Sequence, residues 1–146
     1  MARRAQLFVA THAGALSRAD ALDAGTPPQS DAPHLDLPGM DALDLELLGE
    51  VAASAVRFGV GDVEPVEVDL DHELLFALPT FLTEVLAEVG RAEDPDVPGE
   101  VAQAWAASVE RDESGEELLP ALRGIVAVVV AAEVAGRGVY LWVAGE

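Results

Sequence analysis

The densest group of residues that could do chemistry lies in one short stretch. Asp69, Asp71, His72 and Glu73 place an imidazole among three carboxylates. Such a set could hold a divalent metal ion or supply a general base. A second interpretation needs no ligand, because a strand ending at Asp69 could run into a helix that Asp71 caps and Glu73 continues. This second interpretation accounts for three of the four residues, and a catalytic site would need a further partner from elsewhere in the chain.

The rest of the sequence lacks the common signatures of catalysis. There is no cysteine, which excludes disulfides, thiolate ligands and a nucleophilic thiol. Gly59-Val60-Gly61 lacks the lysine of a phosphate loop, and Gly136-Arg137-Gly138 precedes a predicted strand, whereas dinucleotide motifs follow one. His12 and His34 stand at a predicted strand end and in a proline-rich segment, where histidines are usually solvated. We therefore expect no cofactor and no bound metal, and we favour a protein that is not an enzyme.

The charge balance restricts the kinds of partner. The chain has 27 acidic residues against 8 basic residues, all arginine, and a net charge of −19. Such a surface repels nucleic acids and anionic membranes, so we expect neither as a partner. Two interpretations of the acidity stay open: a solvated surface that favours solubility or life at high salt, or an acidic face that binds a basic protein. The absence of lysine and asparagine indicates a GC-rich bacterial genome.

Two apolar stretches bear on location. The run after Arg3-Arg4 stops at Thr11, which is too early for the apolar region of an export signal. The run from Gly124 to Ala132 ends at Glu133, well short of the roughly 20 residues that span a membrane. We expect a soluble, cytoplasmic protein.

The last third of the chain carries the strongest structural pattern. From Leu118 to Ala135 almost every residue is apolar, and Ser114 stands three residues before a glutamate, the spacing of a capping box. A helix that is apolar on every side should be buried at the centre of the domain. Gly136–Gly138 would then turn the chain into a strand, Val139–Val143. The β-branched residues of Ile125–Val130 leave a strand open as an alternative.

The preceding residues predict further elements. Two strands are expected, Gln6–Thr11 and Val63–Leu70, and Pro65 indicates that the second lies at a sheet edge. Four helices are expected at Ala13–Ala24, Asp41–Val56, Asp71–Val89 (with a kink or a break just before Pro79) and Gly99–Arg111. The inward stripe of the second helix is predicted to be Leu43, Leu47, Leu48, Val51 and Ala52. The segment Thr26–Gly39 holds four prolines and predicts a loop. The two tryptophans are expected to fill core or interface.

The end of the chain resembles that of the YfbM-like proteins, an uncharacterised family of small bacterial α+β proteins. The shared layout consists of Val128–Ala135, Gly136–Gly138 and Val139–Gly145, with a weaker echo in Asp41–Leu48. The resemblance implies an α+β fold and brings no catalytic residues.

Together these patterns predict one α+β domain spanning residues 1–146. About five helices are expected to pack around the apolar C-terminal helix, beside a small three-stranded, mainly antiparallel sheet. The function we expect is that of a small accessory factor that binds protein. Its partner would be a second copy, giving a homodimer through surplus apolar surface, or a basic protein that it inhibits in the manner of an immunity protein. The alternative is a small metal-dependent or hydrolytic enzyme that uses Asp69, Asp71, His72 and Glu73.

Overall fold

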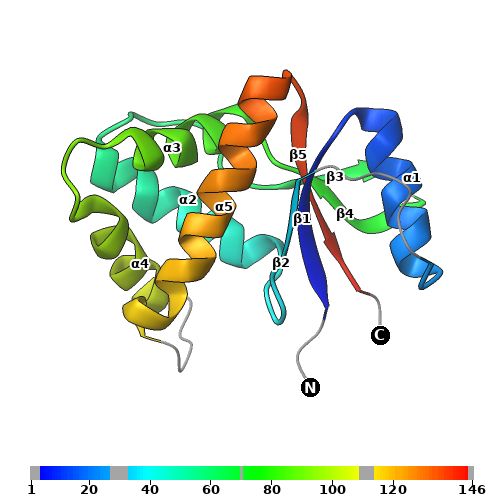
Figure 1. The fold of residues 1–146 in the computed structure, drawn as a ribbon, viewed down its shortest axis with the longest axis horizontal. Helices are drawn as coiled ribbons and strands as arrows, with labels where there is room; N and C mark the ends of the chain where they lie inside the picture. Colours follow the sequence, from blue (N-terminus) through cyan, green and yellow to red (C-terminus); the bar gives the residue numbers. More distant parts are fainter. Residues whose placement is uncertain (1–3, 27–32, 70, 109–113, 145–146) are drawn as a thin grey trace.

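A computed structural model describes residues 4–26, 33–69, 71–108 and 114–144 (Figure 1). Its five strands are β1 (Ala5–Ala10), β2 (His34–Asp36), β3 (Val66–Asp69), β4 (His72–Ala77) and β5 (Gly138–Val143). Its five helices are α1 (His12–Asp23), α2 (Ala42–Val56), α3 (Thr80–Arg91), α4 (Val97–Ser108) and α5 (Gly115–Ala135). The α+β class predicted from the sequence is confirmed.

All five strands belong to one antiparallel sheet in the order β2-β1-β5-β4-β3. The first and last strands of the chain pair along their whole length at its centre, from Ala5 opposite Val143 to Ala10 opposite Gly138. The three predicted strands correspond to β1, β3 and β5, and β3 lies at the edge that Pro65 indicated. The predicted number of three strands was wrong, because β2 and β4 were missed.

The missed strand β4 replaces the first part of the helix predicted over Asp71–Val89. Residues His72–Ala77 pair with β3 on one side and with β5 on the other, so their backbone groups are satisfied by the sheet. Of the kink or break expected just before Pro79, the structure has the break, because Pro79 is the N-cap residue of α3. Proline has no backbone N–H and disfavours helical conformation in the residue before it, which explains the boundary.

The other missed strand, β2, lies within the proline-rich segment predicted as a loop. It is three residues long and pairs with β1, with Leu35 opposite Leu7. Leu35 also packs on α5, where a Cβ atom on Gly124 would lie 2.8 Å from the leucine Cδ2. The rest of that segment includes residues 27–32, which lie outside the described residues.

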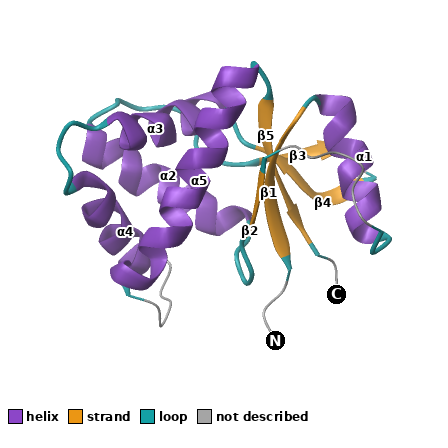
Figure 2. Ribbon diagram, in the orientation of Figure 1, coloured by secondary structure: helices purple, strands orange, loops and turns teal. Residues whose placement is uncertain are grey.

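Helices cover both faces of the sheet, in unequal numbers. Helix α1 packs on one face, and the other four helices form a layer on the opposite face (Figures 1 and 2). Alternation along β1 separates the two cores: Leu7 and Val9 face the four-helix layer, whereas Phe8 and Ala10 face α1. Consequently β1 is buried along its whole length.

Helix α2 begins at a complete capping box. The Asp41 side chain accepts a hydrogen bond from the Asp44 N–H, and the Asp44 side chain accepts one from the Asp41 N–H. The predicted inward stripe was partly wrong, because Leu43 is 57% exposed while Leu45 is fully buried. Helical spacing explains this outcome, since Leu45, Leu48 and Ala52 recur on one face.

The apolar C-terminal segment is helical, as predicted, with Ser114 as its N-cap and Gly136 ending it in the left-handed conformation. Its expected burial on every side was wrong. One face packs on the sheet and on α3 and α4, but Val130 and Val134 are 37% and 85% exposed. By length and composition alone α5 would suit a membrane-spanning helix, a property that buried helices of soluble proteins share. Trp105 and Trp142 lie in the two cores, as expected.

Candidate functional surface

The four candidate residues of the sequence lie at the β3–β4 hairpin. Asp69 and His72 oppose each other in the ladder, joined by position 70 and Asp71, and Glu73 follows in β4. Asp71 is exposed, whereas the side chains of Asp69, His72 and Glu73 lie outside what the structure describes. Their backbones are thus brought to one turn, and the metal or catalytic role stays a prediction. Among the described residues, no group of three or more histidines and carboxylates could hold a metal ion.

The two remaining histidines begin separate elements. His12 is the first residue of α1 and His34 the first of β2, and both side chains are exposed. Their positions in the sequence had predicted that both histidines would be solvated.

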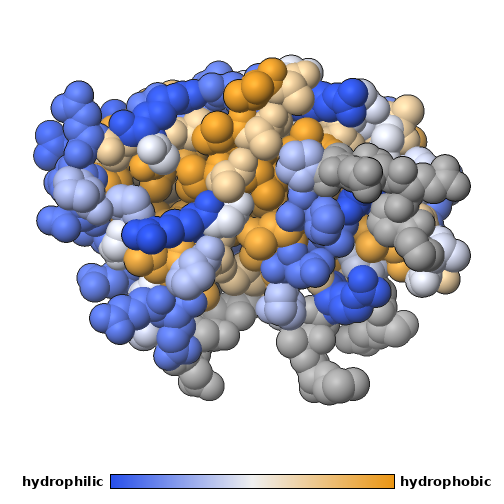
Figure 3. Space-filling view, in the orientation of Figure 1, coloured by the Kyte–Doolittle hydropathy of each residue, from blue (hydrophilic) through white to orange (hydrophobic). Residues whose placement is uncertain are grey.

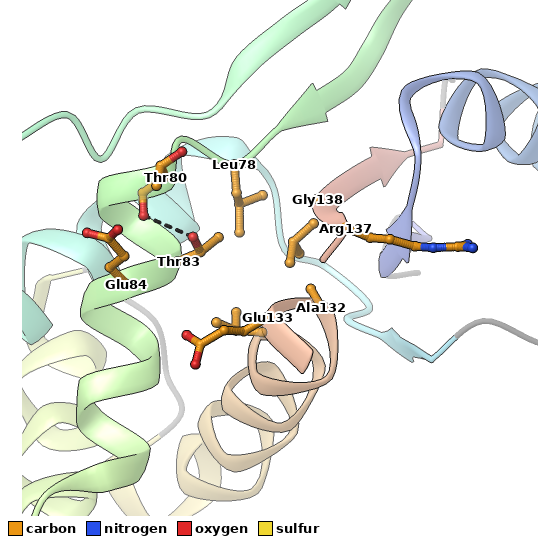
Figure 4. Close-up of a pocket in the computed structure, with 10 residues that line it drawn as sticks. Leu78, Thr80, Thr83, Glu84, Ala132, Glu133, Arg137 and Gly138 are labelled. Atoms are coloured by element: carbon orange, nitrogen blue, oxygen red, sulfur yellow. Dashed lines mark hydrogen bonds between the residues drawn. The ribbon is translucent and has the colours of Figure 1, made fainter. Parts of the chain in front are cut away.

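One pocket of about 260 Å³ lies where the start of α3 meets the end of α5 (Figure 4). Its floor is apolar, formed by Leu78, Val129, Ala132 and Val139. Its polar rim includes Thr83, whose hydroxyl donates to the Thr80 carbonyl over 2.9 Å. The Arg137 side chain, although it borders the pocket, points away from it in Figure 4. The described lining therefore offers hydroxyls and carboxylates but no histidine or cysteine for catalysis.

A second hollow of about 220 Å³ lies between the end of α3 and the middle of α5. It is mainly apolar, lined by Val89, Leu122 and Val126 together with Pro95 and Pro98 of the following segment. The helices approach closely at this point, because a Cβ atom on Gly90 would lie 2.6 Å from Cγ1 of Val126. Glycine at position 90 therefore sets the spacing of α3 and α5.

Ion pairs reinforce the same helix contact at the surface. Arg91 pairs with Glu88 one turn earlier in α3 and with Glu133 of α5. Both pairs raise the pKa of Arg91, with the hydrogen bond to Glu133 as the largest cause. Glu133 of α5 is therefore paired with a residue of another helix.

The loop from α2 to β3 is held firmly against two helices. On α2, a Cβ atom at Gly49 would lie 2.8 Å from Cβ of Val63. At Gly61, an added Cβ atom would lie 2.4 Å from the ring of Phe81 on α3. The ring of Phe58 packs against the same ring in a tilted arrangement, with centroids 5.6 Å apart. These contacts fix both ends of a short segment that projects Val60, whose side chain is fully exposed.

Four carboxylates accompany this loop. Glu46 and Glu50 come from α2, and Asp62 and Glu64 from the loop, where Asp62 accepts a hydrogen bond from the Glu64 N–H. Desolvation raises the pKa of Glu46, and the charges of Glu64, Glu50 and Asp62 raise it further. Every charged neighbour that shifts Glu46 is thus negative. We call the set Glu46, Glu50, Phe58, Val60, Asp62 and Glu64 the acidic loop surface.

The opposite side of the molecule holds a buried polar network with a structural role. Arg18 of α1 is only 6% exposed, and its Nε donates to Oε1 of Gln6 on β1 over 2.7 Å. Gln6 in turn donates from Nε2 to Oδ1 of Asp36 on β2 over 3.1 Å. The Arg18 guanidinium also lies 5.1 Å from the ring centre of Phe8. Burial lowers the pKa of Arg18, and the Asp36 charge opposes that shift. The network ties α1 to two strands.

Comparison with protein-family models, with curated proteins and with solved structures finds no match to this chain. The resemblance to YfbM-like proteins therefore stays a prediction, and function is inferred from the geometry of the surface alone.

Sequence reasoning missed the acidic loop surface. Gly59-Val60-Gly61 was considered only as a phosphate-loop candidate, and the four carboxylates were not singled out. A signal was present in the spacing of Glu46 and Glu50, four apart on one helix face, and in the acids that follow the glycine turn. Their proximity depends on how the loop folds back over α2, which no local pattern encodes.

Proposed function

We propose that this protein is a cytoplasmic accessory factor that binds a basic protein partner through the acidic loop surface, and that it is not an enzyme. The observation that carries the proposal is a fully exposed valine, Val60, on a loop held at both ends and accompanied by four carboxylates. An apolar contact beside several carboxylates is complementary to a protein that offers an apolar contact among basic side chains.

The charge of the chain supports a basic partner over a neutral one. With a net charge of −19, the molecule attracts cationic proteins at a distance and speeds their encounter. The acidic loop surface adds local complementarity, because Glu46 and Glu50 of α2 lie beside Asp62 and Glu64 of the loop. Basic side chains placed there would relieve the mutual repulsion of these carboxylates.

The packing of the loop supports a specific interface over a diffuse one. Phe58 and Gly61 both rest on Phe81, so the loop is already ordered before any partner arrives. A surface that needs little ordering on binding retains more of its contact energy as affinity. The apolar tip at Val60 then supplies a contact that charge alone does not.

The first experiment measures the affinity of the protein for two fluorescein-labelled peptides of equal charge. One peptide alternates arginine with serine, and the other alternates arginine with leucine. We expect the arginine–leucine peptide to bind more tightly, and both affinities to fall as salt is added, because screening weakens exposed ion pairs. Val60→Ser should remove the preference for leucine. The matched variant Val134→Ser, at another exposed valine, should preserve it.

A pair of charge variants tests the position of the site. Glu46→Gln, Glu50→Gln, Asp62→Asn and Glu64→Gln together should weaken peptide binding on the order of tenfold or more, since exposed ion pairs contribute roughly 0.2–1 kcal/mol each. The control removes the same charge elsewhere, with Glu93→Gln, Asp96→Asn, Glu116→Gln and Glu117→Gln. Equal loss of affinity in both variants would overturn the proposed site, because it would mean that only net charge matters.

A further inference from the structure

We propose that the outer face of α5 is a homodimer interface, on which a second copy of this chain docks with its own α5 antiparallel. The inference is independent of the acidic loop surface, because none of the residues involved is shared. It rests on an exposed apolar stripe and on opposite charges placed at equal distances along the helix from Val128.

The stripe follows one side of α5. Ala127, Val130 and Val134 recur at helical spacing, and all three are exposed. Figure 3 shows an apolar area along α5 in the middle of this side of the molecule. A contiguous apolar stripe on the surface of an acidic chain is a candidate interaction site, because covering it removes apolar surface from water.

The charges beside the stripe are complementary to those of a second copy. Arg123 stands five residues before Val128 and Glu133 five residues after it. In an antiparallel pair related by a two-fold axis near Ala127 and Val130, Arg123 of each copy comes level with Glu133 of the other. The two residues cannot pair within one copy, because ten residues of helix separate them by about 15 Å.

The surroundings leave both charges available for this contact. Among the described residues, Arg123 makes no hydrogen bond or ion pair, and its side chain is exposed. Glu133 contacts Arg91 through Oε1, and a carboxylate accepts several hydrogen bonds. Arg123 would repel a basic partner, whereas a second copy places its Glu133 against this arginine. A second copy is therefore the occupant that fits this face.

The experiment is light scattering coupled to size-exclusion chromatography, on the full chain across a range of concentrations. We expect a mass twice the 15.2 kDa of one chain. Val134→Glu should halve that mass, because it places a carboxylate in the apolar stripe. The matched variant Val60→Glu, at a valine outside the stripe, should leave the dimer intact. A monomeric wild-type protein, or a dimer that survives Val134→Glu, would overturn the inference.

Charge-swap variants test the antiparallel arrangement itself. Arg123→Glu and Glu133→Arg should each be monomeric alone, because like charges then meet at both ends of the interface. An equimolar mixture of the two should recover the doubled mass, since each glutamate at 123 would face an arginine at 133 of the other copy. A mixture that stays monomeric, with both variants folded by circular dichroism, would contradict the pairing of Arg123 with Glu133.

Discussion

Gly61 lies directly against the ring of Phe81, so closely that a Cβ atom at position 61 would be 2.4 Å from Cγ of the ring. The contact joins the loop after α2 to helix α3. It therefore connects the position of the acidic loop surface to the packing of the four-helix layer.

Gly61→Ala should displace this loop. Forcing a methyl group into a filled site typically costs about 1–3 kcal/mol, and we expect a loss of that size in the free energy of unfolding, measured with urea. The variant should also bind the arginine–leucine peptide less tightly. Gly99→Ala serves as the control, because nothing lies within 4 Å of an added Cβ atom there. Unchanged stability in Gly61→Ala would show that the loop is not held as described.

Arg18→Met should destabilise the fold on the α1 side. The change leaves the buried Gln6 oxygen without the donor that lies 2.7 Å away, and an unpaired buried polar group costs about 1–3 kcal/mol. Urea denaturation measures the loss. Arg137→Met, at an exposed arginine, should change stability by no more than about 0.5 kcal/mol. Equal effects of the two substitutions would contradict the role given to the buried network.

The raised pKa of Glu46 predicts a pH dependence. A folded-state pKa above the ordinary value of 4.5 means that the folded protein holds this proton more tightly than the unfolded chain does. The ionised side chain therefore destabilises the fold, and Glu46→Gln should raise the free energy of unfolding at pH 7 by at most about 0.5 kcal/mol, because solvent screens these charges. The gain should shrink as pH falls through the raised pKa and vanish below 4.5.

A second glutamate variant is a control for the sign of the stability change in Glu46→Gln. Glu133→Gln removes an ion pair with Arg91, so it should lower stability at pH 7 or leave it unchanged. A Glu46→Gln variant that is less stable than the wild type at pH 7, or whose difference does not vary with pH, would show that the neighbouring carboxylates do not repel Glu46.

Helix and strand types were predictable where a pattern is local. The capping residues at Asp41 and Ser114 and the stop at Gly136 fixed the ends of α2 and α5, because caps act through groups within a few residues. Strand β4 was not predictable in the same way. The sequence of His72–Ala77 has no strict alternation, and it is a strand because β3 and β5 pair with it on both sides.

The candidate surface was less predictable than the fold. The sequence directed attention to four adjacent residues at 69–73, since adjacency is all that a sequence shows. The acidic loop surface instead combines α2 with a loop that passes close to Gly49. The exposure of Val134 could not be predicted either. In a helix whose residues are nearly all apolar, the sequence does not indicate which side the other helices leave uncovered.

The hairpin residues offer a test of the enzyme alternative. Asp69→Ala combined with His72→Ala should leave peptide binding and dimer mass unchanged, because neither residue belongs to the surfaces proposed for those contacts. Titration calorimetry of the wild-type protein with Zn²⁺ and Mn²⁺ completes the test. Stoichiometric metal binding that the double variant abolishes would favour the enzyme over the accessory factor.

An NMR titration of ¹⁵N-labelled protein with the arginine–leucine peptide locates the binding site residue by residue. If the acidic loop surface is the binding site, the largest shift changes will occur at the amides of Glu46, Glu50, Gly59, Val60 and Gly61. Changes spread over all acidic segments, or greatest near Glu116 and Glu117 of α5, would contradict the account, because they would show attraction by net charge without a defined site.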